Sequence, residues 1–132
     1  MATEIARHLP PRPEAAASAR RALDGLTLPP DRVALVRLLV SELVTNSIRH
    51  GALDADQPVR LTARVTGDRV RVEVADAGAG FAPRSGGPQP RKDGWGLVLL
   101  DALAERWGVE QSGATTVWFE VPLALSPRSA TV

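Results

Sequence analysis

A long apolar segment, residues 31–50, limits the folds open to this chain more than any other feature. Asp31 at its start and Gly51 just after its end are the residue types expected at the N-cap and the C′ position of one helix. The apolar side chains cover more than one stripe of that helix, at Val33, Leu35, Val36, Leu38, Leu39, Val40, Leu43, Val44 and Ile48. The sequence therefore predicts a deeply packed helix that other elements cover.

The same helix carries a polar ridge formed by Glu42, Asn46 and His50. Residues four apart lie along one helix face, so these three side chains are predicted to point in one direction. Buried polar groups are costly unless they find partners. Either the ridge faces water, or it faces a ligand that compensates for the burial.

Three segments alternate apolar and polar side chains with the period of a half-buried strand, namely 59–65, 70–74 and 116–121. The turn 66–68 is expected to join the first two as a hairpin. The other expected elements are a short edge strand over 2–9, helices over 14–26 and from about 97 to 107, and a short strand with a turn over 108–113. This order predicts a two-layer α+β sandwich, with a mixed, mainly antiparallel sheet and helices on one face.

Length and composition bound the class of protein. With 132 residues the chain fits one domain, expected over 14–123, between an N-terminal segment 1–13 and a flexible tail 124–132. A formal net charge of +1 gives no general attraction to nucleic acid or to a membrane surface. Cysteine is absent, which excludes disulfides and thiolate metal sites. Because neither a signal peptide nor a membrane-spanning run is visible, we expect a cytoplasmic protein.

The second predicted strand ends on a carboxylate. Its inward series Val70, Val72 and Val74 continues to Asp76, so the strand period aims this side chain toward the core. Asp-Ala-Gly is also good turn chemistry, and the alternative is that the strand has already ended. An inward carboxylate needs a hydrogen-bond donor, which a base-like ligand with an exocyclic amine could supply.

Two glycine pairs follow this aspartate. Gly78 and Gly80 permit positive φ and the close approach of a ligand to the backbone. Gly94 and Gly96 directly precede a helix, whose free N–H groups and dipole form an anion site, most often for phosphate.

The loop between the glycine pairs carries Arg84, Arg91 and Lys92. These cations either face water, which is the more common arrangement, or lie near phosphate oxygens as part of a lid over a nucleotide.

Four stretches together resemble the Bergerat-fold (GHKL) ATPases, which include histidine kinases, gyrase B subunits, MutL-type proteins and heat-shock chaperones. They are SELVTNSIRHG (41–51), VEVADAGAGF (72–81), DGWGLVLLDAL (93–103) and TTVWFEVP (115–122). The short form of the chain is most similar to the bacterial anti-sigma-factor serine/threonine kinases. The resemblance runs from about residue 31 to 122 and implies the same fold.

The resemblance implies roles for the polar ridge and for the strand carboxylate. Asn46 would ligate Mg²⁺, and Glu42 would be the general base for the attacking hydroxyl. Arg49 and His50 would meet phosphates. Asp76 would accept a hydrogen bond from the adenine amino group.

It also implies two further contacts around the base. Gly78 and Gly80 would let the base approach the backbone. Thr115 would join the water network around adenine, because it shares the inward face of Val117, whereas Thr116 should point away.

The phosphate contacts implied by the resemblance follow the second glycine pair. Gly94, Gly96 and the backbone amides of Leu97 and Val98 would cradle phosphates. Lys92 stands where these kinases commonly carry an arginine, and it keeps the charge but loses the bidentate geometry.

By resemblance, the chain is expected to use ATP and Mg²⁺ to phosphorylate a serine or threonine of a small anti-sigma-factor antagonist, and to sequester a sigma factor. A homodimer is consistent with the resemblance. The alternative is a nucleotide-sensing binding module, an anti-sigma factor in which ATP controls docking without phosphoryl transfer.

Overall fold

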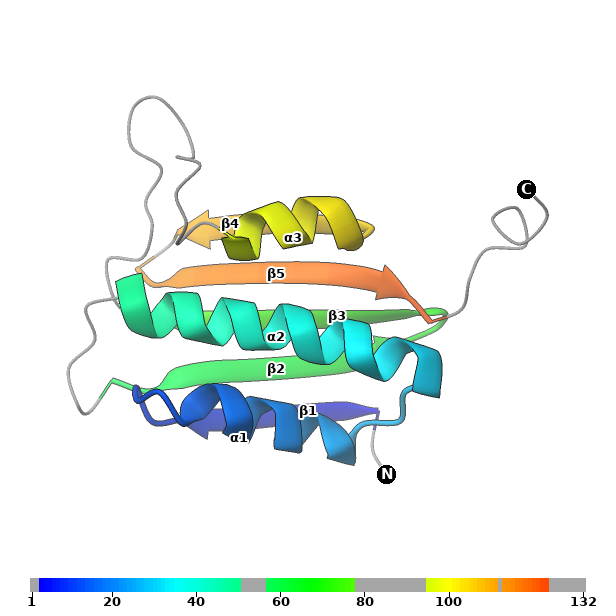
Figure 1. Cartoon of the computed structure of the whole chain (residues 1–132), viewed down its shortest axis with the longest axis horizontal. Coiled ribbons are helices and arrows are strands. Elements are labelled where there is room, and N and C mark those ends of the chain that lie inside the picture. The colour runs from blue at the N-terminus through cyan, green and yellow to red at the C-terminus, as the bar shows by residue number, and fades with distance from the viewer. Residues whose placement is uncertain (1–2, 51–56, 78–94, 112, 124–132) are drawn as a thin grey trace.

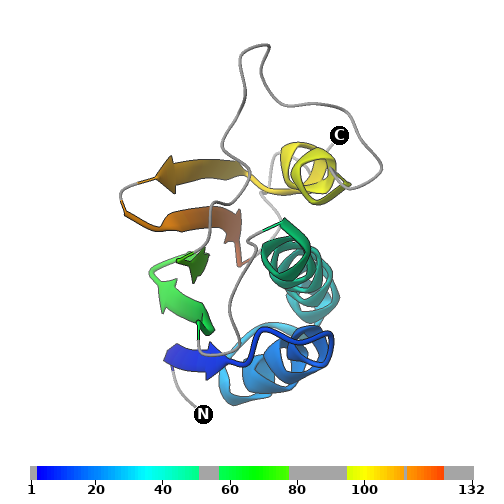
Figure 2. The same cartoon turned by 90° about the vertical axis from the view of Figure 1, so that its left-hand side faces the viewer.

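The computed structural model of the chain describes residues 3–50, 57–77, 95–111 and 113–123. A five-stranded sheet in the order β1-β2-β3-β5-β4 forms one layer, and helices α1, α2 and α3 lie together on one face of it (Figures 1 and 2). The predicted two-layer α+β sandwich is confirmed. The elements are β1 (Glu4–Leu9), α1 (Ala15–Ala22), a 3₁₀ turn (Leu23–Gly25), α2 (Pro30–His50), β2 (Val59–Thr66), β3 (Arg69–Asp76), α3 (Trp95–Leu103), β4 (Arg106–Gln111) and β5 (Thr115–Pro122).

Every neighbouring pair of described strands is antiparallel, where the sequence had suggested a mixed sheet. The predicted hairpin between β2 and β3 is present and turns at Gly67, whose φ of 62° favours glycine. Strand β1 pairs with β2 at one edge of the sheet, as expected, and places Ile5 and Leu9 in the core.

Helix α2 lies across the middle of the sheet and carries the centre of the core (Figure 1). Val36, Leu39 and Val44 on α2 are fully buried, as are Val72 and Phe119 on the sheet. Burying a side chain of this size contributes about 1.5–3 kcal/mol, so the prediction of a deeply packed central helix is confirmed and explained. Among the described residues, no helix is long and apolar enough to span a membrane.

The start of α2 differs from the prediction. The helix begins at Pro30, so Asp31 lies in its first turn and is not the N-cap. Proline is favoured at the first helical position because its fixed φ suits the helix and its missing N–H would have no partner there. Asp31 remains favourable in the first turn, where a negative charge meets the positive end of the helix dipole. Gly51, the expected C′ residue, lies outside the described residues.

For the helix predicted from about 97 to 107, the predicted C-terminal end was wrong. Helix α3 ends at Leu103, and Arg106 and Trp107 belong to β4, which extends the short strand expected after them. The backbone N–H of Glu105 already donates to the carbonyl of Glu120, and Trp107 pairs with Phe119 across the β4–β5 ladder. Pairing with β5 therefore overrides the local helix pattern.

The opposite side of the sheet, which we call the outer face, carries the outward side chains of the five strands. Glu120 on β5 accepts hydrogen bonds there from Arg71 at 2.9 Å and from Arg106 at 2.7 Å. Burial of Glu120 raises its pKa, but the hydrogen bonds and charges of Arg106 and Arg71 outweigh this effect, so its pKa lies below the ordinary value. Arg71 also lies over the Trp118 ring, 4.2 Å from its centroid.

Gly108 on β4 stands directly opposite Trp118 on β5, and a Cβ at this position would lie 2.8 Å from Trp118 Nε1. We expect Gly108→Ala to lower the free energy of unfolding by about 1–3 kcal/mol, because the indole must move. Urea unfolding measures this loss. Gly25→Ala is the matched control, since its Cβ would meet its nearest atom, of Ile5, at 3.8 Å. A loss that persists in a Trp118→Val background would contradict the explanation.

Candidate functional site

Four element ends meet at one end of the molecule. The C-terminal end of α2, the end of β3, the start of β5 and the start of α3 all lie there (Figure 1). The antiparallel register explains part of this arrangement, because the last residue of β3, Asp76, pairs with the first residue of β5, Thr115. The segments 51–56 and 78–94 lie outside the described residues.

The polar ridge of α2 does not point into bulk solvent. Asn46 is only 5% exposed, and Glu42, one turn earlier, is half-buried. The backbone of His50 closes α2, while its side chain lies outside the described residues. Of the two outcomes left open by the sequence, burial rather than hydration is observed at Asn46.

The amide of Asn46 is incompletely satisfied. Among the described residues, its Nδ2 is buried and has no hydrogen-bond partner. A buried donor without a partner costs about 1–3 kcal/mol, so such a group is expected where a ligand completes the site. Because the two ends of an amide have nearly the same shape, a half-turn presents either the nitrogen or the oxygen to a ligand.

Asp76 and Thr115 occupy the inner face of the sheet at this end. Asp76 is 3% exposed and Thr115 is 4% exposed, and they are cross-strand partners. Asp76 continues the buried series of Val72 and Val74 as the last residue of β3, so the strand has not ended before it. Thr116 lies on the other side of β5 and faces outward, as the strand period predicts.

The remaining predicted site residues divide into three groups. Arg49 lies exposed near the end of α2, and Val98 is 49% exposed on α3. Gly96 and Leu97 lie in the first turn of α3, where their backbone amides belong to the helix N-terminus. The four other predicted residues, Gly78, Gly80, Lys92 and Gly94, lie outside the described residues.

Ser47, a buried residue beside Asn46, was not singled out from the sequence. A helical serine often returns a hydrogen bond to its own backbone, so serine within a helix carries little signal for a binding site. The sequence also did not reveal that Nδ2 of Asn46 has no hydrogen-bond partner among the described residues, because that depends on the packing around this side chain.

The donor set at this end fits a magnesium-bound phosphate better than a metal held by protein alone. The described residues contain no group of three His, Cys, Asp or Glu side chains that could hold a metal ion. Mg²⁺ usually keeps several waters and binds through one or two protein oxygens together with phosphate oxygens. The Asn46 amide can supply such an oxygen, and the N-terminus of α3 is a favourable place for anionic oxygens.

The buried Nδ2 donor of Asn46 leads to a prediction on stability. Asn46→Leu should leave the free energy of unfolding unchanged or raise it by about 1 kcal/mol, because it removes a buried donor that has no hydrogen-bond partner among the described residues. Leu43→Asn, the converse change at a buried position of the same helix, should be strongly destabilising. Urea unfolding of both variants without ligand checks this. A loss of more than about 2 kcal/mol in Asn46→Leu would show that the amide has a structural partner.

The sequence of this chain matches a family model and a known relative. The family model of the histidine kinase-like ATPase domain matches residues 9–120. The uncharacterized protein SCO4941 of Streptomyces coelicolor is 42% identical over 76 residues, which are 56% of this chain and 71% of that protein.

A solved structure shows the same fold. The histidine kinase domain of the blue-light activated histidine kinase from Erythrobacter litoralis EL346 superimposes with a TM-score of 0.58 at 24% identity. The match covers 86% of this chain and 61% of that structure, so the chain spans about three fifths of its length. Since the family model covers most of the sequence, the chain belongs to the histidine kinase-like ATPase domain family.

Proposed function

We propose that this protein binds ATP with Mg²⁺ and transfers the terminal phosphoryl group to a serine or threonine of a separate small protein, an anti-sigma-factor antagonist. One observation carries the proposal: two polar side chains, Asn46 and Asp76, are buried from different layers of the fold at the same end of the molecule. Membership of the ATPase family supports nucleotide binding there.

Asp76 and Asn46 are assigned to opposite ends of the nucleotide. Asp76 would accept a hydrogen bond from the exocyclic amine of adenine, with Thr115 beside it on β5. Asn46 would offer its amide oxygen to Mg²⁺, which neutralises phosphate charge when it is bound. Gly78 and Gly80 would let the base approach the backbone.

The phosphates would lie between the end of α2 and the start of α3. Arg49 and His50 would approach them from α2. The amides of Gly96, Leu97 and Val98, together with Gly94 and Lys92, would approach them from the other side.

The transfer step needs a base for the attacking hydroxyl. Glu42 lies one helical turn before Asn46 and is half-buried, so its carboxylate is partly shielded yet reachable. The hydroxyl oxygen would form the new bond to the γ-phosphorus as the bond to the β-phosphate oxygen breaks. Glu42 would take the hydroxyl proton, and ADP would leave. Positioning and charge neutralisation supply most of the catalysis in such a reaction.

The second candidate function is nucleotide sensing without transfer. ATP would then control docking to a partner, such as a sigma factor, and Glu42 would have no chemical role. The placement of a carboxylate one turn from Asn46 favours the kinase, because a sensor needs no base. In both functions the protein would meet its partner in the cytoplasm.

The two functions differ in what Glu42→Gln does. With labelled ATP and candidate antagonist domains, we expect wild type to label a serine or threonine and the variant to lose about 10²-fold or more in rate. ATP affinity should stay nearly unchanged. Asp31→Asn, an exposed carboxylate at the other end of α2, is the matched control and should retain transfer. Unchanged regulation of the partner by Glu42→Gln would support the sensor instead.

The adenine contact is tested separately. We expect Asp76→Asn to weaken ATP binding by about 2 kcal/mol, roughly thirtyfold, because a charge-assisted hydrogen bond to the base is lost. Calorimetry with Mg²⁺ and ATP measures the change, and thermal unfolding without nucleotide shows whether the variant is folded. Asp68→Asn, in the exposed turn that precedes β3, should bind as wild type. Equal affinity of Asp76→Asn and wild type would contradict the assignment.

A further inference from the structure

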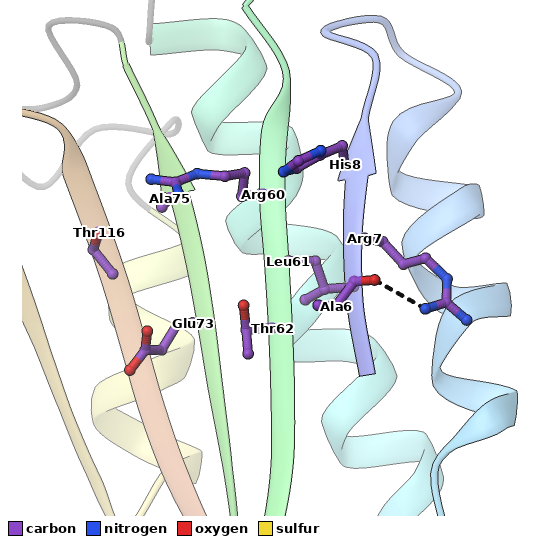
Figure 3. Close-up of a pocket in the computed structure, with 9 residues that line it drawn as sticks. All are labelled: Ala6, Arg7, His8, Arg60, Leu61, Thr62, Glu73, Ala75 and Thr116. Carbon is purple, nitrogen blue, oxygen red and sulfur yellow. Dashed lines mark hydrogen bonds between the residues drawn. The ribbon is translucent and has the colours of Figure 1, made fainter. Parts of the chain in front are cut away.

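A shallow hollow of about 350 Å³ opens on the outer face, on the side of the sheet away from the helices (Figure 3). It extends over β1, β2 and β3 and reaches Thr116 on β5. In the described part of the chain no helix lies over this face, as the edge-on view in Figure 2 shows. The volume is near the lower end of the range found for small-molecule sites, so it suits a ligand smaller than ATP.

Small side chains on three neighbouring strands produce the hollow. Ala6 on β1 pairs with Thr62 on β2, and Ala75 lies one strand further on β3. Alternate residues of a strand share one face, so the register of the sheet sets these three short side chains close together. Longer side chains stand around them, and these decide what the hollow can bind.

The basic end of the hollow consists of His8 on β1 and Arg60 on β2. They are cross-strand partners, and Figure 3 shows both side chains at the upper rim of the hollow. Both are exposed, and among the described residues neither side chain makes a hydrogen bond or an ion pair. Two basic side chains in directly opposite positions repel each other when both are charged, so an anion that contacts both is favourable.

Neighbouring arginines on the outer face differ from Arg60 in this respect. Arg64, four residues further along β2, donates to Glu4 at 3.0 Å. Arg71 on β3 donates to Glu120 at 2.9 Å. Each of these two arginines already has a carboxylate partner. Within the described residues Arg60 has none, so its N–H donors are available to a ligand.

The opposite end of the hollow offers hydrogen-bond acceptors. Glu73 on β3 pairs across the ladder with Thr62, and Figure 3 shows both side chains below Arg60. One carboxylate oxygen of Glu73, Oε2, accepts a hydrogen bond from Nε of Arg71 at 2.9 Å. Because Arg71 already balances the charge of Glu73, the other carboxylate oxygen suits a neutral hydroxyl donor better than a second cation.

We propose that this hollow binds a small phosphorylated polyol, such as a sugar phosphate. The phosphate accepts hydrogen bonds from Arg60 and His8, and the hydroxyl groups of the polyol donate to Glu73 and Thr62. A phosphate monoester has three outer oxygens, so two can accept from the planar fork of Arg60 and the third from the imidazole of His8. A carboxylate has only two oxygens, and the arginine fork occupies both.

Larger anions fit the outer face less well. A nucleic-acid backbone or an anionic membrane needs several unpaired cations in a row. The described strands instead place four acidic residues among the outward arginines, namely Glu4, Glu73, Glu110 and Glu120. No Phe, Tyr or Trp side chain lines the hollow, so it offers little for a nucleobase to stack on.

An NMR titration of the backbone amides with glucose-6-phosphate tests the site. In wild type, the amides of β1, β2 and β3 around the hollow should shift, with a dissociation constant on the order of 1 mM or below. Glucose, which lacks the phosphate, should cause no shifts there. Gluconate, which carries a carboxylate in place of the phosphate, should bind about fivefold more weakly because it leaves His8 without an oxygen to contact.

Charge variants locate the phosphate contact. Arg60→Gln should weaken the binding of glucose-6-phosphate by about tenfold or more, because it removes the charged fork. Arg60→Lys keeps the charge without the fork and should lose about threefold. His8→Ala should lose about threefold through one missing donor. Arg64→Gln is the matched control, since it removes the same charge from the same strand and face and should bind as wild type.

Circular dichroism checks that each variant is folded. Wild type that does not bind glucose-6-phosphate would overturn the proposal, as would equal affinities of wild type and Arg60→Gln. Gluconate that binds as tightly as glucose-6-phosphate would overturn the assignment to a phosphate. Binding that is lost at saturating Mg²⁺ and ATP would place the sugar phosphate in the candidate nucleotide site and would also overturn it. Titration with ATP alone judges the proposed function separately, because the hollow lies on the other side of the sheet.

Discussion

The packing of α2 against the sheet is the interaction on which the rest of the structure depends. Its apolar side chains pack against β2 and β3, and their burial fixes both the distance of the helix from the sheet and its rotation. That rotation decides which of its polar residues are buried. Asn46 is held inside at the same end as Asp76 because Leu43 and Val44, within one turn of it, are anchored in the core. The positions of the polar side chains in the site are therefore fixed by the apolar packing around them.

The sequence was sufficient for most of this layer arrangement because the relevant signals are periodic. The valines of β3 alternate strictly, so the inward position of Asp76 could be predicted from the strand period alone. The spacing of Glu42 and Asn46 likewise placed them on one helix face. The end of α3 could not be predicted in the same way, because the segment 104–107 is decided by pairing with β5, which is not adjacent in the sequence. The start of α2 at Pro30 depends on a local preference that competed with an equally good capping residue, Asp31.

Other features were beyond the sequence for a physical reason. Whether a buried amide lacks a partner depends on every neighbour within hydrogen-bond reach, and no periodicity encodes that for Asn46. The outer face is similar. The outward residues of its strands are mostly arginine, threonine and glutamate, which in the sequence indicate only a solvated face. The ion pair between Arg71 and Glu120 arises when register brings the two residues side by side, and register is a property of the folded sheet.

The two faces of the sheet are linked through single peptide units. Ala75 lies on the outer face, and Asp76, the next residue, lies on the inner face at the candidate nucleotide site. On β5, Thr116 and Thr115 repeat this arrangement. The two surfaces thus lie back to back, separated by one sheet. Because neighbouring residues of a strand point to opposite faces, each surface can change its side chains without displacing those of the other.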